Sequence, residues 1–180
     1  IAKEGAKVTI EEVNYDDCVR MAAAEAEATP HGVVVQDTAW EGYEEIPAWI
    51  MQGYGTMAME AGEQLKAQGC ERPTHIFVQA GVGSLAGAVV GYFSNLYADN
   101  LPTFVVVEAE AAACLYKGAA AGESGAAPFG ALAAMMTMDE YKDLRNDIGL
   151  DENSKVLLFS TEGDTDPDRY KNIVWKGLDK

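Results

Sequence analysis

Short apolar segments that alternate with helical segments constrain the fold of this 180-residue chain more than any other feature. Runs of this kind are typical of strands that lie buried in a parallel sheet. We expect five such strands, at residues 8–10, 32–36, 75–79, 103–108 and 155–159. The sequence therefore predicts one α/β domain over residues 1–180, with a parallel sheet that carries helices on both faces.

Capping residues mark where the intervening helices begin and end. Asn14 is a good N-cap for a helix that runs to about Glu27. A long helix is predicted from about Pro47 until Gly69 closes it. Further helices are expected at residues 84–97 and after Asp166-Pro167, whereas the Ala- and Gly-rich stretch 109–134 suggests two helices split by a glycine turn.

The chain is strongly acidic, with a formal net charge of −16 at pH 7. This charge argues against nucleic acids and anionic membrane surfaces as partners, because both attract Lys and Arg. A soluble acidic surface or a cationic partner would account for it. Cys18, Cys70 and Cys114 lack metal-ligand spacing, and no signal peptide or membrane-spanning run is visible, so we expect a reduced, cytoplasmic protein without a metal site.

A glycine-rich segment, Gln79 to Gly87, follows one predicted strand and opens the next helix. Its glycines allow a tight turn and a close approach to a ligand, and the N–H groups at the helix start favour an anion such as phosphate. Ser84 adds a hydroxyl donor. A tight turn without a ligand is the simpler reading. Because Gly81, Gly83 and Ala86 also fit a dinucleotide fingerprint, and Glu108 ends the next strand, a nicotinamide-dependent oxidoreductase is a further alternative.

Two more polar residues follow predicted strands and so are expected at the same sheet edge as the glycine-rich segment. Ser160 could reach the ring nitrogen of a flat cofactor, or it could serve as a turn or capping residue. Asp37 could act as a general base or bind a substrate ammonium, or it could be a turn aspartate. His31 and His75 are isolated and indicate no catalytic triad.

The sequences of these motifs resemble those of the diaminopropionate ammonia-lyases. The resemblance covers most of the chain and rests on long, unusual stretches: residues 37–40, 42–47, 49–54, 79–91, 107–108 and 160–167. It implies the large lobe of a fold type II pyridoxal-phosphate (PLP) enzyme, similar to tryptophan synthase β. It also implies a homodimer that converts 2,3-diaminopropionate to pyruvate and ammonia.

The resemblance further implies a role for each site residue. Gly81, Val82, Gly83 and Ser84 would form the loop that binds the PLP phosphate. Ser160 would face the pyridine nitrogen of PLP. Asp37 would transfer a proton or bind the substrate amine.

Two departures from the family pattern affect what this chain is expected to do. The family holds PLP on a lysine near the start of the protein, and none of Lys3, Lys7, Lys66, Lys117, Lys142 and Lys155 has that setting. The N-terminal small-domain region also has no counterpart here, and residues 117–122 run directly into 123–126, where the family has a further strand and helix. We therefore expect a junction near residues 122–123 and no activity from this chain alone. A non-catalytic phosphate-binding remnant or subunit is the alternative.

Overall fold

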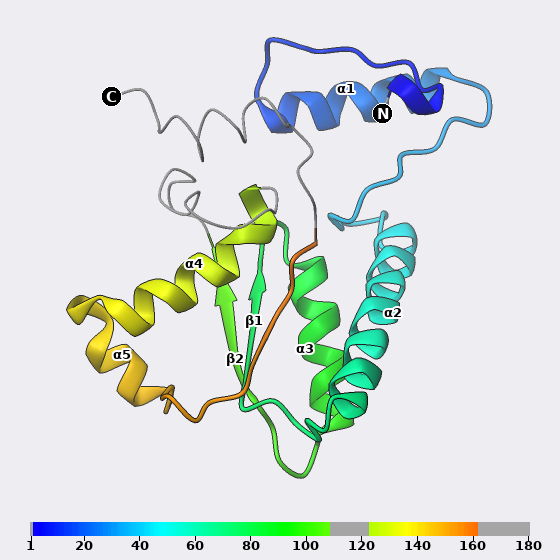
Figure 1. Cartoon of the computed structure of the whole chain (residues 1–180). Helices are drawn as coiled ribbons and strands as arrows, with labels where there is room; N and C mark the ends of the chain where they lie inside the picture. The colour runs from blue at the N-terminus through cyan, green and yellow to red at the C-terminus, as the bar shows by residue number, and fades with distance from the viewer. Residues whose placement is uncertain (1, 109–122, 162–180) are drawn as a thin grey trace. The chain divides into compact units, whose positions relative to one another are not determined.

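The computed structural model describes residues 2–108 and 123–161 (Figure 1). These residues fall into two compact units, 1–36 and 37–180, each of which is described by itself. The predicted helix after Asp166-Pro167 and the first part of the Ala- and Gly-rich stretch lie outside the described residues. Among the residues that are described, no helix is long and apolar enough to cross a membrane.

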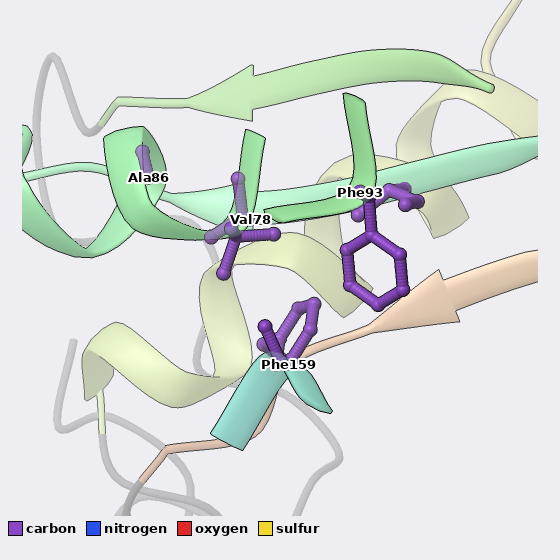
Figure 2. Packing of buried hydrophobic residues seen from close by; sticks show 7 residues of the cluster. Val78, Ala86, Phe93 and Phe159 are labelled. Carbon is purple, nitrogen blue, oxygen red and sulfur yellow. The ribbon is translucent and has the colours of Figure 1, made fainter. Parts of the chain in front are cut away.

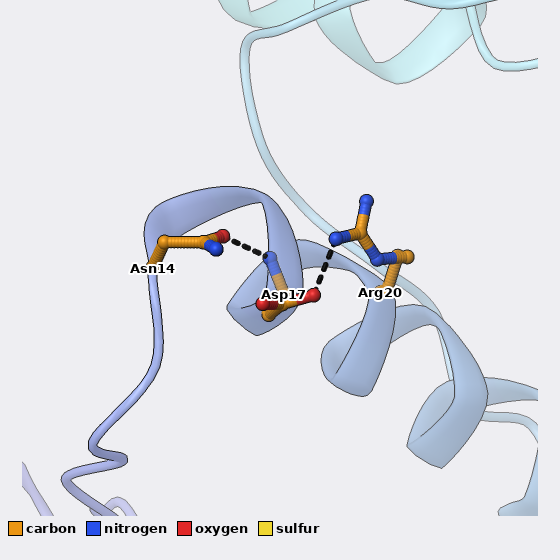
Figure 3. Close-up of polar contacts among 3 residues, drawn as sticks. All are labelled: Asn14, Asp17 and Arg20. Carbon is orange, nitrogen blue, oxygen red and sulfur yellow. Dashed lines mark hydrogen bonds and ion pairs between the residues drawn. The ribbon is translucent and has the colours of Figure 1, made fainter.

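The first unit consists of a short 3₁₀ helix, Ala2–Glu4, and the helix α1, Tyr15–Ala28. As predicted, Asn14 is the N-cap of α1, and its side-chain oxygen accepts a hydrogen bond of 2.9 Å from the backbone N–H of Asp17 (Figure 3). Asp17 also forms an ion pair with Arg20, one turn further along the helix. The N-terminal turn of α1 is therefore stabilised locally by residues that the sequence identifies.

The predicted strands at residues 8–10 and 32–36 are wrong, because neither segment is in a strand. A strand needs a neighbour that satisfies its backbone hydrogen bonds, and the described part of this unit contains no other strand. Ile10, Val33 and Val35 are accordingly 93%, 64% and 71% exposed. Apolar composition alone therefore does not make a strand in this unit.

The second unit is built on a parallel sheet of three strands in the order β2-β1-β3. The strands are β1 (His75–Gln79), β2 (Thr103–Val107) and β3 (Val156–Leu158). In the register of the central strand, Phe77 lies opposite Val105 on one side and Leu158 on the other. These three strands confirm the predictions for residues 75–79, 103–108 and 155–159 to within two residues at each end.

Helices cover both faces of this sheet, as the alternation of apolar segments predicts (Figure 1). The helices α2 (Glu45–Ala67) and α3 (Ser84–Leu96) lie on one side, and α4 (Glu123–Thr137) and α5 (Lys142–Asp147) on the other. A 3₁₀ turn, Asp139–Tyr141, joins α4 to α5. At the end of α2, Gly69 adopts φ +76°, a conformation that suits glycine and closes the helix where predicted.

The two faces of β1 bury different side chains, because successive residues of a strand point to opposite sides. Ile76 and Val78 pack with Phe93 of α3, and Phe159 joins the same cluster (Figure 2). Phe77 points the other way and packs with Met135 of α4 and with Leu150. The apolar run of β1, residues 76–78, is thus explained by burial on both faces, and the buried polar residues His75 and Gln79 lie at its two ends.

Candidate functional site

The carboxyl ends of the three parallel strands meet at one edge of the sheet. The loop Gly81–Gly83 follows β1 there, and Ser160 lies two residues after the end of β3. Two hydrogen bonds hold this edge together: the Ala80 N–H donates to the Val107 carbonyl (2.9 Å), and Gln79 Nε2 donates to Thr161 Oγ1 (2.7 Å). The structure therefore brings the glycine loop and the segment that carries Ser160 to one edge, as the sequence predicts.

The glycine loop presents unused N–H donors to the space in front of it. Gly83 is the N-cap of α3 with φ +94°, and its carbonyl accepts the first helical bond, from the Gly87 N–H at 2.8 Å. The N–H groups of the first turn, from Ser84 to Ala86, therefore have no helical carbonyl to bond. A Cβ placed on Gly81 or Gly83 would meet no atom within 4 Å, and the loop is exposed. This open row of donors at a helix N-terminus suits a phosphate group.

Asp37 lies directly against this loop. The Ser84 hydroxyl donates a hydrogen bond of 2.6 Å to the backbone carbonyl of Asp37, and the Tyr54 hydroxyl donates one of 3.3 Å to its carboxylate oxygen Oδ2. Burial raises the pKa of Tyr54, and the negative charge of Asp37 and the hydrogen bond to it raise that pKa further. Tyr54 therefore stays a neutral donor, and the Asp37 carboxylate is held half-buried beside the first turn of α3.

One part of the Asp37 prediction is wrong, because the residue does not end a strand. It reaches the edge of the sheet through Ser84 and Tyr54, which come from α3 and α2. His75 lies at the other end of β1, only 3% exposed, where its ring nitrogens contact Thr74 Oγ1 (2.8 Å) and the Ile148 carbonyl (2.9 Å). Both contacts are structural, so His75 serves the packing at the edge opposite the site.

Comparison with known proteins decides the family. The family model described as "Pyridoxal-phosphate dependent enzyme" matches residues 1–156 of this chain. The chain belongs to that family. Its membership agrees with a phosphate-binding loop at the carboxyl edge of a parallel sheet, and it argues against the nicotinamide-dependent alternative.

Within the PLP-dependent enzymes, this chain is similar to proteins of one named activity. The chain is 38% identical to a diaminopropionate ammonia-lyase of Salmonella typhimurium over 244 residues, which are 98% of this chain and 60% of that protein. It is also similar to the apo structure of the Escherichia coli diaminopropionate ammonia-lyase, with a TM-score of 0.84 and 38% identity over 98% of this chain and 57% of that one. A second structure of the E. coli enzyme, in complex with an aminoacrylate–PLP azomethine reaction intermediate, gives a TM-score of 0.83 at 34% identity, over 98% of this chain and 61% of that one.

This chain is shorter than the region of its relatives with which it aligns. The chain spans about 60% of the curated relatives it matches. The alignment with the Salmonella enzyme runs over 244 residues, whereas this chain has 180. Within the aligned region, at least 64 positions of the relative therefore have no matching residue in this chain. Because the alignment takes in 98% of this chain, those positions fall between segments that do align.

Some residues at this edge of the sheet have a geometry that suits PLP, and others only lie at the same edge. The open N–H donors of the first turn of α3, from Ser84 to Ala86, suit a phosphate, and the exposed glycines Gly81 and Gly83 leave space in front of that turn. Ser160 is exposed at the same edge, immediately after the buried Phe159. Val82 is 50% exposed in the loop. Glu108 is exposed just past β2.

Three polar residues of this edge have no role assigned from the sequence, although each lies in a segment that the sequence motifs single out: Tyr54, Gln79 and Thr161. Tyr54 does carry a signal, because it falls at helical spacing with the buried residues Pro47 and Ala58 and so lies on the inner side of α2. Gln79 also carries one, since it is a polar residue that directly follows the apolar, buried run at residues 76–78 of β1. Nothing in the local sequence pairs Gln79 with Thr161, which is 82 positions away.

Proposed function

We propose that this chain is the cofactor-binding lobe of a PLP-dependent ammonia-lyase that converts 2,3-diaminopropionate to pyruvate and ammonia. The observation that carries the proposal is the bond between Ser84 and the Asp37 backbone, which sets a carboxylate beside an anion-binding helix N-terminus. The similarity to enzymes named diaminopropionate ammonia-lyase supports the substrate. A homodimer and a cytoplasmic location, which the family resemblance of the motifs implies, are further parts of the proposal.

The glycine loop and Ser160 would hold the cofactor. Backbone N–H groups from Gly81 to Ser84 would bind its phosphate, helped by the dipole of α3. The Ser160 hydroxyl would bind its ring nitrogen. When bound, PLP supplies an electron sink for the carbon from which a proton is removed.

Asp37 would handle the proton or the leaving amine. Its carboxylate can accept a proton or bind an ammonium group, and both tasks require it to be ionised when substrate arrives. The Tyr54 hydroxyl donates to Oδ2 and leaves the other carboxylate oxygen, Oδ1, for the substrate. Ser84 meanwhile fixes the Asp37 backbone, so the position of the base depends on the same residue that opens the cofactor loop.

The described lysines of this unit lie away from the loop. Lys66 is in the last turn of α2, and Lys155 precedes β3, where its backbone N–H bonds to Thr74 at the amino edge of the sheet. Five residues of strand separate that edge from the glycine loop, a span of about 16 Å. Lys142 begins α5, beyond the end of α4. None of these three is placed to hold PLP covalently at the loop.

This placement favours a second candidate, a lobe that binds phosphate or PLP without catalysing the reaction alone. A single α/β domain over residues 1–180, with a junction near residues 122–123, is part of the same proposal. The relative's 64 or more additional aligned positions support that junction. The intact mass of the purified protein shows whether further residues, and a further lysine, accompany this sequence.

One experiment separates the candidates. The protein is mixed with PLP and with each stereoisomer of 2,3-diaminopropionate, and PLP binding and pyruvate release are measured together. Borohydride reduction followed by peptide mapping then locates any lysine joined to PLP. Saturable PLP binding with pyruvate release supports the ammonia-lyase. Binding without release, and without a stoichiometric adduct on Lys66, Lys142 or Lys155, supports the non-catalytic lobe, and failure to bind PLP overturns both.

A further inference from the structure

Among the described residues, only one of the two polar atoms of the Gln79 side chain finds a hydrogen-bond partner. The residue is only 7% exposed, and its Nε2 donates to Thr161 Oγ1 at 2.7 Å. Its Oε1 is buried and has no hydrogen-bond partner among the described residues. An acceptor buried without a partner is destabilising, so it calls for a reason.

The position of Gln79 supplies that reason. It is the last residue of the central strand β1, two residues before Gly81. Its amide bonds to Thr161, the residue after Ser160. Gln79 therefore lies between the two segments proposed to hold the phosphate and the ring nitrogen of PLP, at the edge where parallel sheets bind their ligands.

We propose that Gln79 Oε1 accepts a hydrogen bond from an O–H or N–H group of the molecule bound at this edge. The inference rests on the proposed function and adds a positioning residue to it. The glycine loop provides donors, which suit phosphate oxygens, whereas a carbonyl oxygen repels them and needs a donor instead. Bound PLP offers its ring hydroxyl, and the amino-acid substrate offers its ammonium group. Gln79 thus contacts a part of the ligand other than its phosphate.

Three variants separate this role from a structural one. Gln79→Met removes the acceptor and the bond to Thr161. Gln79→Glu keeps an acceptor at the same reach and can still accept from the Thr161 hydroxyl. Thr161→Val removes that bond and leaves Gln79 Oε1 in place. Affinities for PLP and for inorganic phosphate are measured by calorimetry on each, and thermal midpoints are measured without ligand.

We expect Gln79→Met to weaken PLP binding about three- to tenfold, the value of one hydrogen bond, and to leave the affinity for inorganic phosphate unchanged. Thr161→Val should stay within about threefold of the wild type for PLP, whereas Gln79→Glu keeps an acceptor but adds a negative charge, so any loss it shows should shrink at high salt. The midpoint of Gln79→Met without ligand should not fall, because the substitution also removes an unpartnered buried acceptor. If the donor is the substrate ammonium, PLP affinity is unchanged and 2,3-diaminopropionate instead binds about three- to tenfold more weakly to PLP-loaded Gln79→Met.

Several outcomes would overturn the inference. Unchanged affinities for both PLP and substrate in Gln79→Met would show that Oε1 meets no ligand donor. An equal loss for inorganic phosphate, or the full loss in Thr161→Val, would show that Gln79 only shapes the edge. A loss in Gln79→Glu that equals the loss in Gln79→Met and persists at high salt would show that an acceptor at this position meets no ligand donor. A wild-type protein that binds no PLP would overturn the proposed function itself and this inference with it.

Discussion

Replacing Gly83 by Asp places a negative charge at the N-cap of α3, where the account puts the phosphate of PLP. Gly83 has φ +94°, so any side chain there carries backbone strain, which for Ala is about 1–2 kcal/mol. Space is not the obstacle, because a Cβ at Gly83 would meet no atom within 4 Å. Asn and Asp both tolerate left-handed backbone and have nearly the same shape, so the difference between Gly83→Asn and Gly83→Asp isolates the charge.

The magnitude follows from Coulomb's law. A phosphate monoester carries a charge of about −2 at neutral pH. At a separation of about 5 Å in a water-like dielectric, its repulsion by one carboxylate is about 1.7 kcal/mol, and it grows as the site excludes water. We therefore expect Gly83→Asp to bind PLP at least about 15-fold more weakly than Gly83→Asn, with a difference that shrinks at high salt.

Calorimetric titration with PLP and with inorganic phosphate measures both affinities. Gly69→Asp is a matched control, because Gly69 has φ +76° with open space around it but closes α2 before the amino end of β1. It should lose stability in the same way as Gly83→Asp and keep its PLP affinity. Equal affinities for Gly83→Asp and Gly83→Asn, together with native circular dichroism spectra, would refute the assignment of the phosphate to this loop.

Three further predictions concern residues around the loop and the core. In the PLP-loaded enzyme, Asp37→Asn should lower kcat by about 10²–10⁴-fold and retain PLP binding, as expected for loss of a general base. A loss in kcat below tenfold for both substrate stereoisomers would show that Asp37 is only a turn residue. A large loss for one stereoisomer alone would show that a second base serves the other. Tyr54 has a pKa raised above its ordinary value of 10.0, so its stabilising effect is complete below about pH 10 and is lost as the pH rises further. Tyr54→Phe should therefore flatten the alkaline fall in unfolding free energy, and an unchanged pH profile would contradict the contact with Asp37. Phe93→Ala should cost about 3–5 kcal/mol in urea unfolding, because Phe93 is fully buried against Val78 and Phe159, and a cost below about 1 kcal/mol would contradict the packing of that cluster.

What the sequence predicts correctly is mostly local or repetitive. The N-cap Asn14 acts three residues along the chain, and Gly69 closes α2 from within its own turn. The strand β1 is recognisable because burial on both faces demands apolar residues at its centre, and β2 because it is a run of β-branched and aromatic residues. These features are visible in a single segment of sequence without knowledge of its neighbours.

What the sequence does not predict depends on contacts between distant segments. Residues 32–36 have the composition of a buried strand, but their exposure shows that composition does not supply a pairing partner. Asp37 is expected at the correct edge for the wrong reason, since Ser84 and Tyr54 hold it there rather than a strand. Gln79 and Thr161 meet only because β1 and β3 are neighbours in the sheet.

The central claim is that PLP binds where α3 begins. An NMR titration of ¹⁵N-labelled protein with PLP tests it residue by residue. With PLP, we expect saturable shifts that are largest for the backbone amides of Gly81 to Ala86 and that also include the amide of Ser160. With inorganic phosphate, we expect shifts only for the amides of the glycine loop and the start of α3. Shifts that instead centre on the cleft of about 300 Å³ lined by Arg72, Asn95 and Tyr97, near the amino ends of the strands, or shifts that never saturate, would contradict it.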